Sequence, residues 1–89
     1  MTEAAVILSN KLGLHARPSA KVSQLASSFK SDVWLARGSR KINAKSIMGV
    51  MMLAAPQGSS LSVSAEGVDE AQAVQALVDL FASGFGEPG

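Results

Sequence analysis

Residues 60–66 read Ser-Leu-Ser-Val-Ser-Ala-Glu, and polar and apolar side chains alternate at every step. Because successive side chains of a strand point to opposite faces, this pattern predicts a strand with one buried face and one solvated face. A sheet with one wet face leaves only its other face for helices. The stretch 60–66 therefore predicts an open-faced sandwich, in which helices cover one side of a sheet.

The segments before and after this stretch predict the other elements. Residues 5–9 and 32–37 are apolar runs typical of strands, and Gly38-Ser39 forms a two-residue hairpin signal before a further strand at 40–43. Apolar residues at helical spacing predict a helix after Pro18 and another after Asp69, and a short apolar helix follows Ser46. The two long stripes are Val22, Leu25, Ala26 and Phe29, and Val74, Leu77, Val78 and Phe81.

The resulting element order is β-α-β-β-α-β-α. A helical link returns the chain parallel to its start and often leaves a gap, which a later strand fills in the antiparallel sense. We expect one domain over residues 1–89, an α+β open-faced β-sandwich with three helices on one face. Residues 84–89, which begin at the helix stop signal Gly84, are expected to form a frayed tail. The solvated face of the first helix is expected to carry Lys21, Ser23, Gln24 and Ser28.

Composition excludes several classes of protein. The chain has 8 basic and 7 acidic residues, a net charge of +1, which is too balanced for a strong nucleic-acid or membrane-surface binder. It has no cysteine, so a disulfide framework and a thiolate metal site are both excluded. The sequence shows no signal peptide, and its longest apolar stretch, 47–55, is too short to cross a bilayer. We therefore expect a soluble, cytoplasmic protein without membrane insertion.

His15 is the residue with the clearest chemical potential. It is the single histidine, so we expect no metal site and no cofactor. It stands just before a helix whose first turn holds Pro18, where free N–H groups and the positive end of the helix dipole attract anions. Arg17 can fork onto phosphate oxygens. This arrangement predicts a phosphoryl acceptor at His15, although a site that only binds an anion would have the same pattern.

Ser46 and the helix after it suggest a second functional region. Ser46 is expected to cap this helix, and phosphorylation there is a possible regulatory modification. Val50 and Leu53 are the expected inward pair. The outward residues Ile47, Met48 and Met51 are either leftover core residues or a docking surface, which we favour because methionine adapts to several partners. Ala16, Ala20 and Gln24 on the first helix would extend this surface around His15.

Two stretches resemble the signatures of the HPr family, the histidine-containing phosphocarriers of the bacterial phosphoenolpyruvate-dependent phosphotransferase system. They are residues 13–19, Gly-Leu-His-Ala-Arg-Pro-Ser, and residues 45–53, Lys-Ser-Ile-Met-Gly-Val-Met-Met-Leu. Ser62, the run 65–67 and the closing helix are also similar, so the resemblance covers nearly the whole chain. It implies four antiparallel strands with three helices, and a carrier without independent turnover.

The resemblance also implies partners and residue roles. Enzyme I, charged by phosphoenolpyruvate, would phosphorylate His15, through Nδ1, and IIA components would receive the phosphoryl group. Arg17 would steady that group, and an HPr kinase/phosphorylase is a possible partner at Ser46. We expect a monomer and no nucleic-acid partner.

Other interpretations remain open. The protein could be a non-covalent regulator of enzymes or transcription factors, although the presence of His15 argues against a purely regulatory relative. It could also belong to the nitrogen-related branch of the system, which residues 80–85 resemble, whereas residues 45–53 look more like the sugar branch. A small nucleic-acid-binding domain is disfavoured by the charge balance and by Trp34 being the one exposed aromatic candidate.

Overall fold

The computed structural model describes residues 1–87 of the chain. Its strands form one antiparallel sheet in the order β1-β4-β2-β3. The strands are β1 (Thr2–Ile7), β2 (Asp32–Arg37), β3 (Arg40–Asn43) and β4 (Ser60–Glu66). The last strand in sequence thus fills the gap between the parallel strands β1 and β2, as the sequence predicts.

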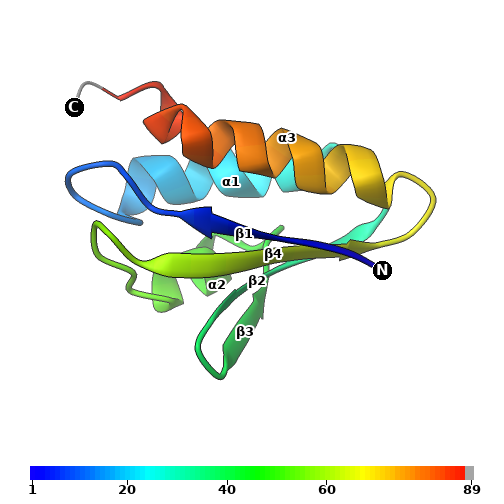
Figure 1. The fold of residues 1–89 in the computed structure, drawn as a ribbon, viewed down its shortest axis with the longest axis horizontal. Helices are drawn as coiled ribbons and strands as arrows, with labels where there is room; N and C mark the ends of the chain where they lie inside the picture. The colour runs from blue at the N-terminus through cyan, green and yellow to red at the C-terminus, as the bar shows by residue number, and fades with distance from the viewer. Residues whose placement is uncertain (88–89) are drawn as a thin grey trace.

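Helices lie against one face of this sheet. They are α1 (Ala16–Ser27), α2 (Ile47–Met52) and α3 (Glu70–Ala82), followed by a short 3-10 helix, η1 (Gly84–Gly86). Figure 1 shows α1 and α3 side by side above β1 and β4, and the side chains of Glu3, Ala5 and Ile7 on the opposite face of β1 are exposed. The short helix α2 packs against α1 and β3. The predicted α+β open-faced sandwich is confirmed.

The core lies between β4 and the two long helices. Leu61, Val63 and Ala65 are buried on the helix side of β4, as their alternation predicts. Leu77 and Phe81 of α3 are fully buried, while Val78 is only partly buried. No helix in the described part of the chain is long and apolar enough to span a bilayer.

Two serines expected in solvent are buried. Ser64 points to the uncovered face of β4 yet is only 4% exposed, because it lies between Glu3 of β1 and Trp34 of β2. Ser23 is 8% exposed because α1 packs against α2 there, and its hydroxyl donates to the Lys45 carbonyl at 2.6 Å. Small hydroxyl side chains fit such contacts between elements, which alternation and helical periodicity do not reveal.

The ends of several elements also differ from the predicted ones. The first strand spans Thr2–Ile7 rather than 5–9, although Leu8 just beyond it is fully buried. Asp69 occupies the N-cap position of α3, but its carboxylate does not cap that helix. It accepts instead from the backbone N–H groups of Lys30 and Ser31, so it ties the α1–β2 turn to the start of α3.

The end of the chain is folded where the sequence predicted a frayed tail. Gly84 has a φ of +63° and ends α3, as expected of a stop signal. The chain then turns back, and Phe85 is 1% exposed with its ring centroid 4.9 Å from that of Phe81. Burial of this aromatic ring therefore overturns the prediction for residues 84–87. Residues 88–89 lie outside the described part of the chain.

Candidate functional site

His15 is the N-cap residue of α1 and has an extended backbone, with φ −89° and ψ −170°. Its carbonyl accepts the first helical hydrogen bond, from the Ser19 N–H at 3.0 Å. Its own N–H donates to the Gly13 carbonyl at 3.0 Å, and the Leu14 N–H donates to the Ala55 carbonyl at 3.0 Å. The loop that carries the imidazole is therefore fixed at both ends before any ligand arrives.

The start of α1 offers unpaired donors beside this side chain. No side chain caps the helix, and the N–H groups of Ala16 and Arg17 have no acceptor within residues 1–87. Pro18 has no N–H to satisfy. These free amides carry the positive end of the helix dipole, so the position next to His15 attracts an anion.

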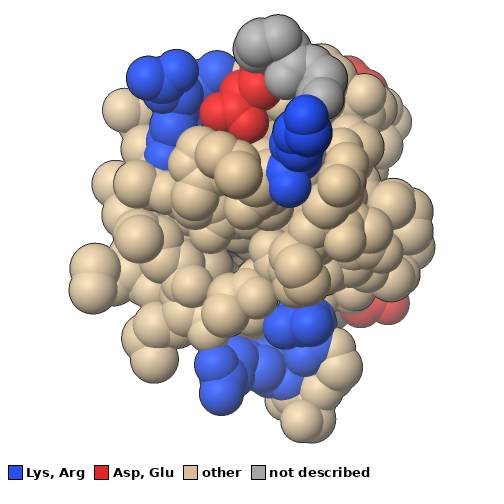
Figure 2. All heavy atoms as spheres, turned by 90° about the vertical axis from the view of Figure 1, so that its left-hand side faces the viewer, with Lys and Arg blue, Asp and Glu red and all other residues tan. Residues whose placement is uncertain are grey.

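The His15 ring borders an open hollow with a volume of about 900 Å³. The lining residues come from the loop before α1, its first turn and the end of the chain: Lys11, Leu12, His15, Ala16, Arg17 and Glu87. Figure 2 shows basic groups on both sides of an acidic one at this end of the molecule. With 35% of its side chain exposed, His15 is reachable from solvent. The structure thus brings Arg17 to the same hollow as His15, as the sequence predicts.

Glu87 is the residue of this site that sequence reasoning missed. One of its carboxylate oxygens lies 3.5 Å from Nε2 of His15, and the other accepts from the Asn10 side-chain amide at 3.2 Å. The same Asn10 amide donates to the Gly13 carbonyl at 2.7 Å. The available signal was Phe85, a bulky apolar residue among glycines near the end of the chain, because such a residue needs burial.

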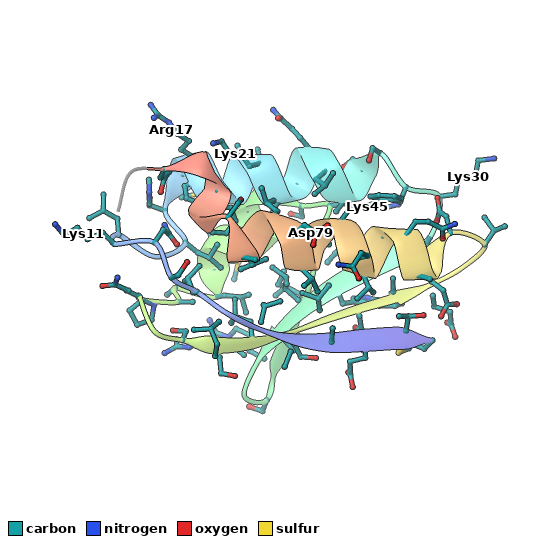
Figure 3. All side chains as sticks on the ribbon, turned by 45° about the horizontal axis from the view of Figure 1, so that its top comes forward. Lys11, Arg17, Lys21, Lys30, Lys45 and Asp79 are labelled. Carbon is teal, nitrogen blue, oxygen red and sulfur yellow. The ribbon has the colours of Figure 1, made fainter. Side chains whose placement is uncertain are left out.

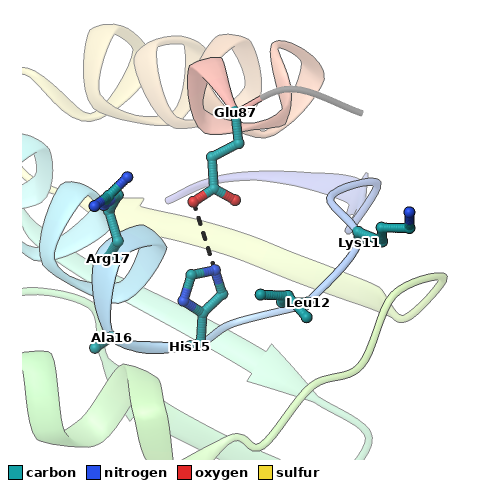
Figure 4. Close-up of a pocket in the computed structure, with 6 residues that line it drawn as sticks. All are labelled: Lys11, Leu12, His15, Ala16, Arg17 and Glu87. Carbon is teal, nitrogen blue, oxygen red and sulfur yellow. Dashed lines mark ion pairs between the residues drawn. The ribbon is translucent and has the colours of Figure 1, made fainter.

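The imidazole has two different surroundings. Figure 4 shows Glu87 above the Nε2 edge of the ring, whereas Nδ1 faces the side of Arg17 and the first turn of α1. Nδ1 is therefore the ring nitrogen nearer to the anion-attracting helix start.

The second region lies on the short helix α2. Ser46 caps α2, because its hydroxyl oxygen accepts from the Gly49 N–H at 3.1 Å, and it is exposed. Val50 and Leu53 are buried, as predicted. The residues expected to face outward do so, and Met52 joins them. The apolar patch comprises Ile47, Met48, Met51 and Met52.

The three α1 residues expected to extend this patch have different exposures. Ala16 and Gln24 are exposed, and Ala20 is partly buried. Because α1 and α2 are in contact, these three positions lie on a helix that adjoins the helix carrying the apolar patch. Two arginines lie at the other end of α2: Arg37 donates to the Leu53 carbonyl at 3.2 Å, and Arg40 to the Met52 carbonyl at 2.7 Å.

Comparisons with known proteins agree on one family. The family model described as the PTS HPr component phosphorylation site matches residues 2–83. The phosphocarrier protein HPr of Cupriavidus necator is 56% identical over 78 residues, covering 88% of each chain. The crystal structure of an HPr from Thermoanaerobacter tengcongensis has a TM-score of 0.96 and 50% identity, covering 100% of each chain.

A further similar structure is that of Crh, the catabolite repression HPr of Bacillus subtilis. Its solution structure has a TM-score of 0.67 and 41% identity, covering 90% of this chain and 94% of Crh. The similarity therefore extends to a relative whose name refers to regulation.

Proposed function

The chain belongs to the HPr family of the phosphotransferase system, and from this premise we propose that it carries a phosphoryl group on His15 from Enzyme I to IIA components. The observation that carries the proposal is the place of the imidazole. His15 is a third exposed, precedes the free amides of α1 and shares a hollow with Arg17. These are the features that a reversible acceptor of a small anion requires.

The proposed step is a displacement at phosphorus. The lone pair of Nδ1 attacks the phosphorus atom held by phosphorylated Enzyme I, and a nitrogen–phosphorus bond forms as the bond to the donor breaks. The electron pair of the broken bond stays with the donor. The free amides of α1 and the Arg17 guanidinium then hold the phosphoryl oxygens, and the same exchange in the opposite direction delivers the group to a IIA component.

The apolar patch is proposed as the docking surface for these partners, together with Ala16, Ala20 and Gln24. Met48 is 68% exposed and Met52 is 61% exposed, and they share one short helix with the exposed Ile47 and Met51, so the apolar side chains are grouped as they are at interaction sites. Flexible methionines suit a surface that fits both a donor and several acceptors. We expect the protein to act as a cytoplasmic monomer, because the donor and the acceptors must bind in turn to the same docking surface.

Regulation through Ser46 is the second candidate function. The Ser46 side chain is exposed at the start of α2 and borders the apolar patch. A phosphate there would add about two negative charges, which the start of a helix accepts but an apolar interface does not. Similarity to Crh supports this candidate. An HPr kinase/phosphorylase would be the enzyme responsible, and the output could serve sugar uptake or the nitrogen-related branch.

The carrier proposal is tested by incubating the protein with Enzyme I and phosphoenolpyruvate labelled on phosphorus. The wild type should acquire label that is stable in base and labile in acid, and addition of a IIA component should remove it. The His15→Ala variant should acquire none while keeping the wild-type circular dichroism spectrum. An unlabelled wild type, or a His15→Ala variant labelled to the same extent, contradicts the proposal.

A further inference from the structure

The end of the chain is anchored at three points before it reaches the site. Phe85 is buried against Phe81, and the Lys21 ammonium group donates to the Phe85 carbonyl. Asn10 then holds one oxygen of the Glu87 carboxylate at 3.2 Å. Because backbone and side chain are both fixed, Glu87 occupies a defined position over the His15 ring.

The contact between Glu87 and His15 concerns one particular atom. Nε2 of His15 is shielded from solvent and has no hydrogen-bond partner within residues 1–87. The second Glu87 oxygen lies 3.5 Å from it, and only 17% of the Glu87 side chain is exposed. A small shift of the carboxylate would complete a hydrogen bond from Nε2–H, and hydrogen bonds at such sites commonly tighten when the reaction begins.

We propose that Glu87 is a positioning residue for phosphoryl transfer, which turns the His15 ring so that Nε2–H faces its carboxylate and the Nδ1 lone pair faces the start of α1. This inference rests on the proposed function of His15. The carboxylate itself does not touch the phosphoryl group. It acts through the ring by orienting the nucleophile, much as the orienting group of a nucleophile–base–orienter arrangement acts through the base.

Charge supports the same role. When the Nδ1 lone pair forms its bond to phosphorus, the proton stays on Nε2 and the ring becomes positive. The Glu87 carboxylate lies next to that positive charge, whereas the incoming phosphoryl group adds at the opposite nitrogen, on the Arg17 side (Figure 4). Coulomb energy falls with distance, so each unit of charge on the ring interacts more strongly with the carboxylate than each unit on the more distant phosphoryl group.

The test compares Glu87→Ala and Glu87→Gln with Glu66→Gln, which removes an exposed carboxylate of β4 at the opposite end of the strand layer. Transfer from phosphorylated Enzyme I is followed in a rapid-quench experiment over a range of Enzyme I concentrations. Glu87→Ala should slow transfer about fivefold at saturation, the size expected for a partly exposed ion pair, without changing the half-saturating concentration. Glu87→Gln keeps an acceptor but no charge and should fall between Glu87→Ala and the wild type, while Glu66→Gln should match the wild type.

Nitrogen-15 NMR of the His15 ring measures which ring nitrogen carries the proton. This property would not change if Glu87 only stabilised the fold. In the wild type the proton should reside on Nε2, and Glu87→Ala should raise the population carrying it on Nδ1. A wild-type transfer rate in Glu87→Ala, or an unchanged tautomer population, overturns the inference. If the wild type itself fails to accept label, the proposed function fails. If the wild type accepts label and Glu87→Ala transfers it at the wild-type rate, only this inference fails.

Discussion

Gly13 and Ala55 approach each other backbone to backbone: a Cβ atom on Gly13 would lie 2.3 Å from the Ala55 carbonyl oxygen. That oxygen accepts the Leu14 N–H, and Gly13 has a φ of +72°. The loop that presents His15 is thereby attached to the segment that follows α2. Only glycine satisfies both the close approach and the left-handed backbone.

A Gly13→Ala substitution should lower the free energy of unfolding by about 3 kcal/mol, the sum of left-handed strain and a steric clash. Gly38→Ala is the matched control, because Gly38 has a φ of +60° but no atom within 4 Å of the added Cβ. It should cost about 1 kcal/mol. Urea unfolding of both variants measures the difference, and equal losses would show that the Ala55 contact does not constrain the loop.

An Arg17→Ala substitution should slow phosphoryl transfer to His15 by about tenfold or more. It removes the guanidinium group, which can donate two hydrogen bonds to the phosphoryl oxygens during transfer. Lys30→Ala is the control, since Lys30 lies at the opposite end of the helical layer (Figure 3). Single-turnover transfer from Enzyme I measures the rate, and thermal unfolding should be unchanged. If Arg17→Ala transfers as fast as Lys30→Ala, Arg17 has no part in the site.

A Met48→Asp substitution should weaken binding of Enzyme I and IIA components, because it places a charge within the apolar patch, yet leave the thermal midpoint within a few degrees of the wild type. Val50→Asp, two positions further along α2 on its buried side, should unfold the protein because it buries an unpaired charge. Titration calorimetry and thermal unfolding separate the two effects. Unchanged partner affinity in Met48→Asp would remove the patch from the docking surface.

The stability of the fold should fall in acid through Asp69. The hydrogen bond from the Ser31 side chain, and next that from the Lys30 backbone N–H, lower the pKa of Asp69 from 3.8 to about 2. Since the native state binds this proton more weakly than the unfolded chain, stability is full above pH 4 and declines as pH falls toward 2. A hydrogen bond from Thr2 likewise lowers the pKa of Glu70.

Asp69→Asn should therefore flatten part of this acid dependence and leave the part due to Glu70. Ser31→Ala removes the first-ranked of the hydrogen bonds, so the native pKa of Asp69 should rise toward 3.8 and the loss of stability in acid should become smaller and end at a higher pH. Urea unfolding at several pH values between 2 and 5 measures the slope. A slope in Asp69→Asn equal to that of the wild type would contradict the assignment.

A Phe85→Ala substitution should cost about 3 kcal/mol of unfolding free energy, because it empties a buried aromatic site. Val68→Ala, which truncates a side chain that is 83% exposed, should change stability by less than about 0.5 kcal/mol. Thermal and urea unfolding measure both. A small loss in Phe85→Ala would mean that the end of the chain does not depend on this ring, and would also weaken the case for a fixed Glu87.

The sequence predicted those features that depend on local pattern or on chemistry at a helix start. The alternation in 60–66 placed β4 correctly, and the Ser46 cap located the start of α2. The environments of Ser23 and Ser64 could not be predicted, because each is buried by contacts between separate elements.

The position of Glu87 could not be predicted for the same reason. A Gly-rich end predicts fraying when each residue is judged alone, yet Phe85 finds a partner in Phe81 within the preceding helix. The contacts of the Glu87 side chain with Asn10 and His15 span more than seventy positions. His15 and Arg17, by contrast, lie two positions apart, so the sequence alone could bring them together.

The central place of β4 has a consequence for synthesis on the ribosome. Within residues 1–87, β1 has no neighbour in the sheet other than β4, which is encoded more than fifty residues later. A nascent chain that ends before Ser60 can form the β2–β3 hairpin but leaves β1 without any pairing strand. Most of the sheet must therefore assemble late in translation or after release, and until then chaperones have an open strand edge to shield.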